Sequence, residues 1–404
     1  MPLIMSFRRW WAAIFVAILL LPALGHFLPD APAPMRTVLA PEARWWEDAA
    51  RRLDPWINNT FGFRGAVLAA HRSYVRFIGD SQSRLVLKGE HGALYLNSEK
   101  AVEQSIGQVV RPEEVAHFLA FAQRMNAYMT AQGGRFVVVV APNGQTANFE
   151  LLPAYARQLK KSPTEFDLVA QGLKAEGVAF ADVRPLFTEA KKTGPVHWLY
   201  DTHWNRRGAL IAFNATMVAA GRPDLQISAD DALGPPEPTM KGDLARMGGI
   251  TPARPDVDYP PKGPTLDQPG QVEMPGVMQP VGMTDPFESY AYSTGHAGPR
   301  ILVIGDSFTQ GFWRGWLAYR ASAYGWTHHR YCRFDMGAVE RFKPDILIYA
   351  PTERAMQCKG EPFVAQDGPG QGGQGQGTPG NAAPGNATPG NAAPTNATPT
   401  KGGG

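Results

Sequence analysis

Residues 301–308 read ILVIGDSF, and this stretch decides what kind of fold the chain can form. The apolar run at 301–304 does not alternate with polar residues, which is typical of a parallel strand buried on both faces. Gly305-Asp306-Ser307 ends the run, and we expect a helix to follow. At the carboxyl edge of such a sheet, Ser307 would stand at the mouth of the crevice where open α/β sheets bind ligands. Gly-Asp-Ser alone is also ordinary turn chemistry, so both interpretations stay open here.

Three further apolar runs have the same character, and helical segments lie between them. Strands that alternate with helices predict an α/β fold, a three-layer sandwich with a mostly parallel sheet. Two short β-rich runs within Arg84–Leu96 predict a hairpin. The predicted strands are Arg135–Ala141, Val178–Val183, Arg300–Ile304 and Asp345–Tyr349, and the predicted helices are Arg111–Gln132, Asp167–Glu176, Leu210–Ala220 and Trp313–Tyr324.

A second polar motif lies about a hundred residues upstream of the serine, where residues 200–208 read YDTHWNRRG. In an extended segment Asp201 and His203 face the same side, because side chains two apart share a face. The carboxylate could then accept a hydrogen bond from one imidazole nitrogen and leave the other free for a nucleophile. Asp-x-His alone could equally be a surface pair or part of a metal site. With Ser307, the motif supplies a nucleophile, a general base and its orienting group.

The N-terminus predicts export. Arg8 and Arg9 precede an uncharged apolar run, Trp10–Leu24. Its length lies between a signal-peptide core of about 7–15 residues and a spanning helix of about 17–25. The arginines would stay on the cytoplasmic side and direct the rest of the chain outward. We expect residues 1–28 to be an uncleaved signal anchor; a cleaved signal peptide and a buried helix of a cytosolic protein are the alternatives.

Composition excludes several classes of protein. Lys and Arg number 39 against 36 Asp and Glu, a net charge of +3 without a basic block, so no nucleic-acid partner is expected. A hydrophobic share of 44% excludes a wholly disordered chain. His328-His329 has no further ligand at usual spacing, and we predict no metal and no cofactor. In an exported chain, Cys332 and Cys358 could form one disulfide or remain free thiols.

The chain divides into segments of different composition. Residues 29–80 predict a helical N-terminal segment, and residues 81–360 predict the catalytic α/β domain. A Pro/Gly-rich stretch near 234–299 is long for a structureless loop, so we expect an elaborated insertion beside the site. Residues 361–404 form a low-complexity tail with repeats such as GNAAP, which we expect to be disordered.

The two motifs together resemble the alginate O-acetyltransferase family, whose catalytic domain is SGNH-hydrolase-like. Its Asp-His element precedes the serine, as here, whereas ordinary SGNH hydrolases have the opposite order. The resemblance covers roughly residues 45–356. It rests on GDSF at 305–308, DTHW at 201–204, NTFGFR at 59–64, VLKGEHGALY at 86–95 and PDILIYAPTER at 344–354.

This resemblance implies that Ser307 is the nucleophile, His203 the general acid and base, and Asp201 the orienting group. It implies an O-acetyltransferase that is periplasmic, tethered to the inner membrane, and active on an exported polysaccharide such as alginate or cellulose. A membrane-bound O-acyltransferase would supply the acetyl groups. A polysaccharide acetylesterase or deacetylase with the same triad and a catalytically silent polysaccharide-binding scaffold are the alternatives.

Further candidate site residues are suggested by their type and by their position near the two motifs. The Ser307 backbone amide and the Asn143 side chain are candidate oxyanion donors, although an asparagine before Gly144 is also a common turn residue. Aromatic and basic residues near the two motifs could bind sugar, or they could be core residues and a solvated helix face. The substrate-binding candidates are Trp204, Tyr200, Trp313 and Arg206.

Overall fold

The structure is a computed structural model that describes residues 85–240, 242–262, 270–279 and 286–363, with 10, 11, 14–16 and 20. The chain divides into two units, Met1–Ser83 and Arg84–Gly404, and the fold below is that of the second. No helix among the residues just given is both long and apolar enough to cross a membrane. The predictions for 29–80, for most of 1–28 and for the tail after 363 lie outside these residues.

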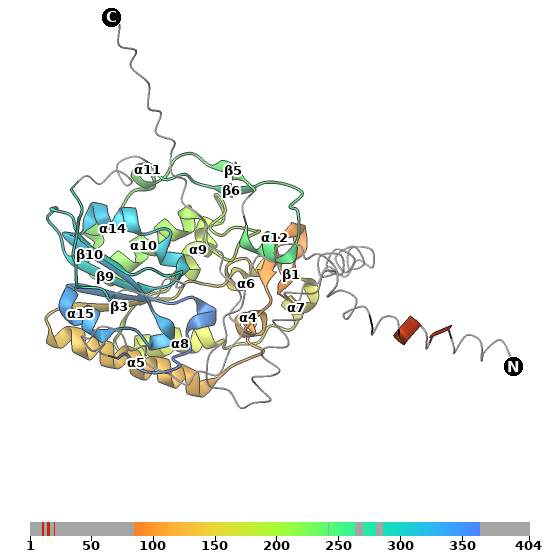
Figure 1. Ribbon diagram of the computed structural model, residues 1–404, viewed down its shortest axis with the longest axis horizontal. Coiled ribbons are helices and arrows are strands. Elements are labelled where there is room, and N and C mark those ends of the chain that lie inside the picture. Colours follow the sequence, from red (N-terminus) through yellow and green to blue (C-terminus); the bar gives the residue numbers. More distant parts are fainter. Residues whose placement is uncertain are drawn as a thin grey trace, which may run out of the picture. The chain divides into compact units, whose positions relative to one another are not determined.

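A seven-stranded sheet forms the centre of the second unit, in the order β4-β3-β11-β9-β10-β8-β7 (Figure 1). The first five strands are parallel, and the last two are antiparallel additions at one edge. This confirms the predicted α/β fold with a mostly parallel sheet. The bounds are β4 Ala179–Ala181, β3 Arg135–Val139, β11 Ile346–Ala350, β9 Arg300–Gly305, β10 Ala323–His328, β8 Tyr290–Ser293 and β7 Val272–Glu273.

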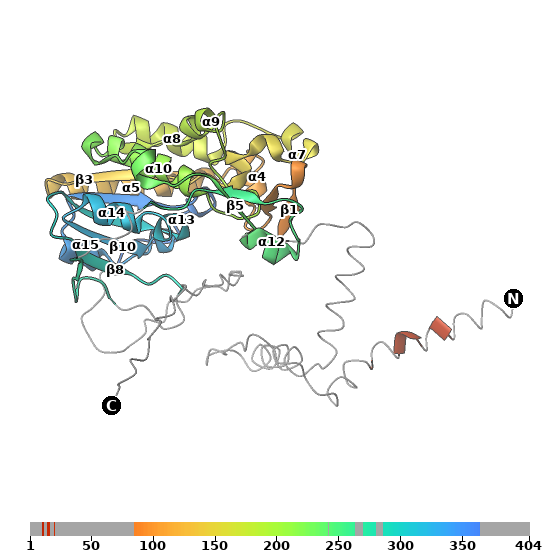
Figure 2. The same cartoon turned by 90° about the horizontal axis from the view of Figure 1, so that it is seen from above.

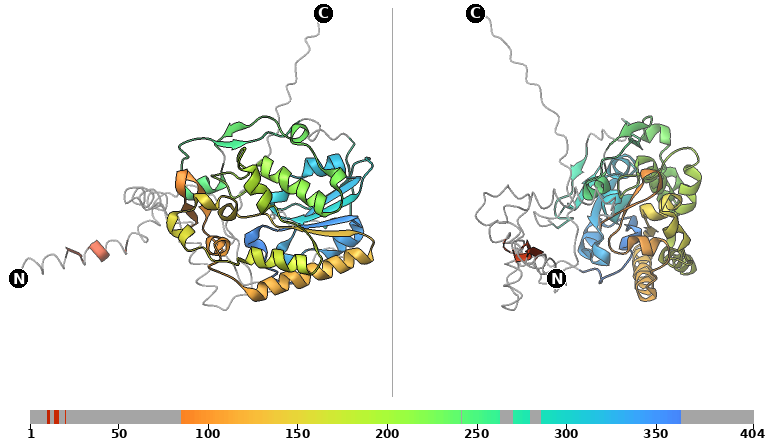
Figure 3. Two further views of the ribbon diagram at one scale, coloured as in Figure 1. Left: turned by 180° about the vertical axis from the view of Figure 1, so that it is seen from behind. Right: turned by 90° about the vertical axis from the view of Figure 1, so that its right-hand side faces the viewer.

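Helices cover both faces of the sheet and make two separate cores (Figures 1 and 2). Alternate residues of one strand enter opposite cores: Ile301 and Val303 face one, Leu302 and Ile304 the other. This is why the unbroken apolar runs predicted the central strands. The rear view in Figure 3 shows α10 and α5 on opposite sides of the sheet. One core contains α9 (Arg184–Ala190), α10 (Arg206–Ala219) and α14 (Arg314–Arg320), and the other α5 (Pro112–Ala131), α8 (Glu165–Ala175) and α15 (Met336–Phe342).

One predicted helix was partly wrong. The expected helix Trp313–Tyr324 ends at Arg320, and the chain then enters β10, which pairs with β9. Tyr324 and Trp326 are fully buried against the sheet, so pairing with β9 decides their conformation rather than local helix propensity.

A smaller layer lies at one end of the sheet and includes the predicted hairpin, β1 Val86–Lys88 and β2 Leu94–Leu96. Part of the insertion packs on it: α12 (Asp243–Gly248) contributes Leu244 to a core with Val86 and Leu94. The remaining elements are η1 Glu90–Gly92, α4 Ala101–Ser105, α6 Gly144–Ala147, η2 Phe149–Leu151, α7 Ala154–Gln158, η3 Pro223–Leu225, α11 Ala229–Ala232, β5 Glu237–Thr239, β6 Asp256–Asp258, α13 Ser307–Gln310, η5 Arg330–Cys332 and η6 Glu353–Ala355.

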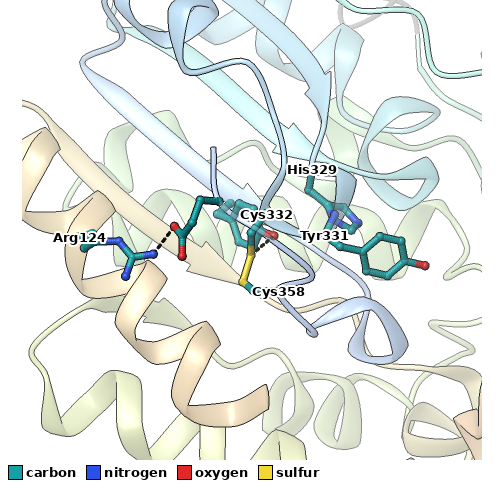
Figure 4. Close-up of a disulfide and its surroundings, with 7 residues drawn as sticks. Arg124, His329, Tyr331, Cys332 and Cys358 are labelled. Carbon is teal, nitrogen blue, oxygen red and sulfur yellow. Dashed lines mark hydrogen bonds and ion pairs between the residues drawn. A yellow bond between two sulfur atoms is a disulfide. The ribbon is translucent and has the colours of Figure 1, made fainter. Parts of the chain in front are cut away.

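One disulfide joins Cys332 to Cys358, across 26 residues and a Cα–Cα distance of 5.0 Å (Figure 4). It connects η5, after β10, to the segment after η6. An ion pair between Arg124 and Glu361 lies close by. Of the two possibilities left open for these cysteines, the structure contains the paired form.

Gly208 tests the packing of α10. Alanine normally stabilises a helix interior by about 1 kcal/mol over glycine. A Cβ at Gly208, however, would lie 2.0 Å from the carbonyl oxygen of Val196, a backbone atom that cannot turn away. We expect Gly208→Ala to lower the free energy of unfolding by about 1–3 kcal/mol in urea denaturation.

Gly337→Ala in α15 is the matched control, since the nearest atom to its Cβ is the movable end of Arg341, at 2.7 Å. That variant should change stability by less than about 1 kcal/mol. A Gly208→Ala protein as stable as the parent would contradict the packing described here.

Candidate active site

The structure brings the two sequence motifs into contact. Ser307 is the first residue of α13, directly after β9, and His203 lies in the loop before α10. The Ser307 hydroxyl lies 2.8 Å from His203 Nε2, and His203 Nδ1 lies 2.6 Å from Asp201 Oδ1. With Nδ1–H donating to Asp201, Nε2 is free to accept from the serine. This arrangement can deprotonate a hydroxyl and form an ester with an acyl group.

A buried tryptophan ties the two catalytic segments together. The indole N–H of Trp204 donates to the backbone oxygen of Phe308 at 3.0 Å, and the two rings pack edge to face. Behind Trp204, Asn205 caps α10 by accepting from the Gly208 N–H. Trp204 and Asn205, the two residues after His203, are therefore both fixed by hydrogen bonds, and they hold the His203 backbone in place.

The turn that carries the nucleophile is held from below by Asp306. Its carboxylate accepts from the backbone N–H groups of Phe308 and Thr352 and lies 3.6 Å from His329 Nε2. Burial favours the neutral acid, but His329 and these donors outweigh burial and hold the pKa of Asp306 well below its ordinary range. The Ser307 N–H has no acceptor among the described residues, so it can donate to a developing oxyanion.

The charges around the pair formed by Asp201 and His203 favour a charged imidazole in the folded protein. Burial disfavours the imidazolium, yet the hydrogen bond and charge of Asp201, with the charge of Asp243, raise the pKa of His203 above its usual value. Burial would also raise the pKa of Asp201, but the hydrogen bond and charge of His203 lower it. This is the electrostatic support that a general base needs when it takes up a proton.

Asp243 and Arg354 are site residues that the sequence analysis did not single out. Asp243 lies in α12, and its Oδ2 is 3.7 Å from His203 Nδ1. Arg354 lines a small cavity with Asp201 and Thr202, and its guanidinium lies 5.5 Å from the Phe308 ring centroid. Arg354 is the last residue of PDILIYAPTER at 344–354, one of the motifs that carry the family resemblance, whereas nothing in the local pattern around Asp243 pointed to a site.

Asp201, His203 and Asp243 are also the only three residues in the described part of the chain whose donor atoms are close enough for a metal ion, all within 4.8 Å. These atoms already have partners within the protein. Asp201 accepts from His203, and Asp243 accepts from the backbone and hydroxyl of Thr202. We therefore interpret the group as a hydrogen-bonded carboxylate cluster.

Asn143 lies at the same sheet edge, but its side chain has other partners. Its amide nitrogen donates to Ser105 Oγ at 3.1 Å, and its oxygen faces Arg354 at 3.4 Å. Its backbone N–H donates to Glu353, whose pKa burial raises to about 7. An oxyanion role for Asn143 stays a prediction.

The substrate-binding candidates are placed differently from expectation. Trp204, Tyr200 and Trp313 are at most 3% exposed, so their rings pack the interior and cannot present a face to a sugar. Arg206 is bound by Asp258 of the insertion. Proximity in sequence to the motifs did not distinguish side chains that point into the core from those that point to the site.

Two other aromatic side chains lie at the site and keep part of their surface. Phe312, just after α13, lies 6.3 Å from the His203 ring, and Trp198 lies 5.8 Å from Phe312, by ring centroids. Both are half-buried. The backbone N–H of Trp198 donates to the His203 backbone oxygen, which joins this residue to the catalytic loop.

Comparison with known proteins identifies one family. The family model of the ALGX SGNH hydrolase-like domain, acetyltransferase AlgX, matches residues 86–319. No curated protein matches the chain significantly.

Solved structures of three proteins show similarity to this chain. The O-acetyltransferase domain of Pseudomonas putida AlgJ has 17% identity and a TM-score of 0.41, over 67% of this chain and 91% of that one. Bacillus cereus PatB1 has 13% identity and a TM-score of 0.50, over 67% and 97%. Pseudomonas aeruginosa AlgX has 15% identity and a TM-score of 0.40, over 66% and 61%.

The raised pKa of His203 predicts a pH profile. A general base must be neutral, so turnover of an acyl ester should rise with pH through that pKa, above about 6.5. Asp201→Asn removes the charge that raises the pKa of His203, so the ascending limb of the pH profile should move to lower pH. The plateau should fall by about 10³–10⁴-fold. The measurement is kcat/KM for a chromogenic acetate ester across the neutral pH range.

Ser307→Ala serves as the control and should show no turnover with an unchanged thermal midpoint. Full activity in that variant, or an Asp201→Asn limb that stays in place, would contradict the assignment.

Proposed function

The chain belongs to the family of SGNH hydrolase-like acetyltransferases represented by AlgX, and on that premise we propose that it is a serine O-acetyltransferase acting on hydroxyls of an exported polysaccharide. The observation that carries the proposal is the unbroken contact from Asp201 through His203 to Ser307, with distances of 2.6 Å and 2.8 Å. Alginate-like and cellulose-like polymers are the substrate class that the family resemblance supports.

The first half of the proposed reaction loads the enzyme. His203 Nε2 takes the hydroxyl proton of Ser307, and Oγ attacks the carbonyl carbon of an acetyl donor. The Ser307 N–H, with Asn143 as a further proposed donor, stabilises the oxyanion. When the tetrahedral intermediate collapses, the bond to the donor's leaving group breaks, and that group takes the proton from His203. An acetyl ester on Ser307 remains.

The second half unloads it by the same groups. His203 takes the proton of a sugar hydroxyl, whose oxygen attacks the acetyl-serine carbonyl. The bond between the acetyl carbon and Ser307 Oγ then breaks, the acetyl group stays on the sugar oxygen, and His203 returns the proton to Oγ. Water in place of the sugar would give hydrolysis. The partly exposed pair Trp198 and Phe312, beside His203, favours a sugar acceptor, because aromatic faces bind the apolar side of pyranose rings.

The proposal places this chemistry in the periplasm. Arg8 and Arg9 followed by Trp10–Leu24 support an anchor in residues 1–28 that tethers the domain to the inner membrane. The disulfide is consistent with an oxidising compartment. A membrane-bound O-acyltransferase is the proposed source of acetyl groups.

Transfer is tested directly by incubating the protein with an activated acetyl ester and oligosaccharides of alginate or cellulose. We expect acetylated oligosaccharide by mass spectrometry with the parent and none with Ser307→Ala. Free acetate alone would support the esterase alternative instead. Polymer binding without any turnover would support the scaffold alternative.

Trp198→Ala tests the acceptor side. Loss of the ring face should raise the KM for the oligosaccharide about tenfold, equivalent to about 1.4 kcal/mol, and more than it changes turnover of the small ester. Trp198→Phe retains an aromatic face and should recover most of the affinity. An unchanged acceptor KM in the alanine variant would remove Trp198 from the acceptor site.

A further inference from the structure

We propose that Asp243, supplied by the insertion, is a positioning residue that fixes Asp201 and Thr202 behind the catalytic imidazole. The inference rests on the proposed serine chemistry and deepens it, because it assigns the insertion a role in that same site. Asp243 does not touch the reacting atoms. It acts through the two residues that hold His203.

Asp243 holds Asp201 through its backbone. The Asp243 N–H donates to Asp201 Oδ2 at 2.9 Å, while Oδ1 of the same carboxylate accepts from His203 Nδ1 and from the His203 backbone N–H. Donors on both oxygens stop the Asp201 carboxylate from rotating. The orienting oxygen therefore stays in line with the imidazole.

The Asp243 side chain holds Thr202. Its Oδ1 accepts from the Thr202 N–H at 2.8 Å, and its Oδ2 accepts from the Thr202 hydroxyl at 2.5 Å. With its proton directed to Asp243, the hydroxyl turns a lone pair towards His203 Nδ1, 3.2 Å away. Without Asp243, the Thr202 hydroxyl would lose the acceptor that fixes its orientation beside His203.

The insertion is built to place Asp243 at this point. The N–H groups of Leu244 and Ala245 donate to the backbone oxygen of Tyr200, the residue before Asp201. Gly242 makes this approach possible, since a Cβ there would lie 2.1 Å from the same oxygen. The first turn of α12 is thus joined directly to the catalytic loop.

The charges around Asp243 come from several elements. Asp201 and His203 face it from the catalytic loop, and Asp256 of β6 and Arg354 of η6 lie near the same pair. Burial and the Asp201 carboxylate raise the pKa of Asp243, and the charge of His203 and the two Thr202 bonds oppose that shift. When ionised, Asp243 adds a second negative charge behind His203 Nδ1.

The test compares two variants at Asp243 on a chromogenic acetate ester. Asp243→Ala should lower kcat by about 10²-fold, the usual effect of misplacing a catalytic group by about 1 Å, with KM changed less than about twofold. Asp243→Asn retains an acceptor for the Thr202 N–H and should recover to within about tenfold of the parent. Its ascending pH limb should move to lower pH, because one carboxylate no longer faces the imidazolium.

Gly242→Ala displaces Asp243 without removing its charge and should also lower kcat, which keeps the proposal testable if Asp243→Ala does not fold. Asp258→Asn is the matched control. Asp258 joins the insertion to Arg206, which follows the catalytic loop, and it contacts neither Asp201 nor His203. It should keep kcat within about threefold, because the Asp258 carboxylate contacts Arg206 and not Asp201, Thr202 or His203.

Three results would overturn the inference. These are a parental kcat in Asp243→Ala, an equal loss in Asp258→Asn, or activity that a chelator removes and a divalent metal restores. A parent that turns over the ester but does not acetylate polymer would instead overturn the transferase function and leave the role of Asp243 intact.

Discussion

The catalytic contact depends on one buried connection between two distant parts of the chain. Ser307 follows β9 and His203 precedes α10, 104 residues earlier, so nothing local holds them together. Trp204 joins the two segments, because its indole N–H donates to the Phe308 carbonyl and its ring packs edge to face on the Phe308 ring of α13. A hydroxyl and an imidazole that meet before substrate arrives need not be reorganised during the reaction, which is where such sites gain rate.

The sheet positions the nucleophile turn, and the insertion positions the residues behind the catalytic imidazole. The carboxyl ends of β9 and β11 hold the nucleophile turn through Asp306, which bonds Phe308 and Thr352. The insertion reaches the opposite side of the imidazole, where α12 bonds Tyr200, Asp201 and Thr202. Ser307 and His203 are consequently fixed by elements that are far apart in the chain, and Asp201 and Asp243 both raise the pKa of His203 against the effect of burial.

Much of the fold and part of the site could be predicted. Apolar runs without alternation identified β3, β9 and β11, and the two polar motifs identified Ser307, His203 and Asp201, which the structure brings together. Of the sugar-binding candidates, Trp204 and Trp313 are fully buried, whereas Trp198 and Phe312 keep exposed surface beside His203. The sequence around an aromatic residue near a motif is the same whether its side chain points into the core or towards the site.

Local patterns were enough for β3, β9 and β11 and for the order of the serine and histidine motifs, because each depends on residues close in the chain. The contribution of Asp243, the burial of Tyr200 and the pairing of β10 with β9 required the tertiary structure. These depend on which segments meet across long loops, and a hydrogen bond between distant residues leaves no periodicity in the sequence. Proximity in three dimensions, unlike strand propensity, is a property of the whole packed chain.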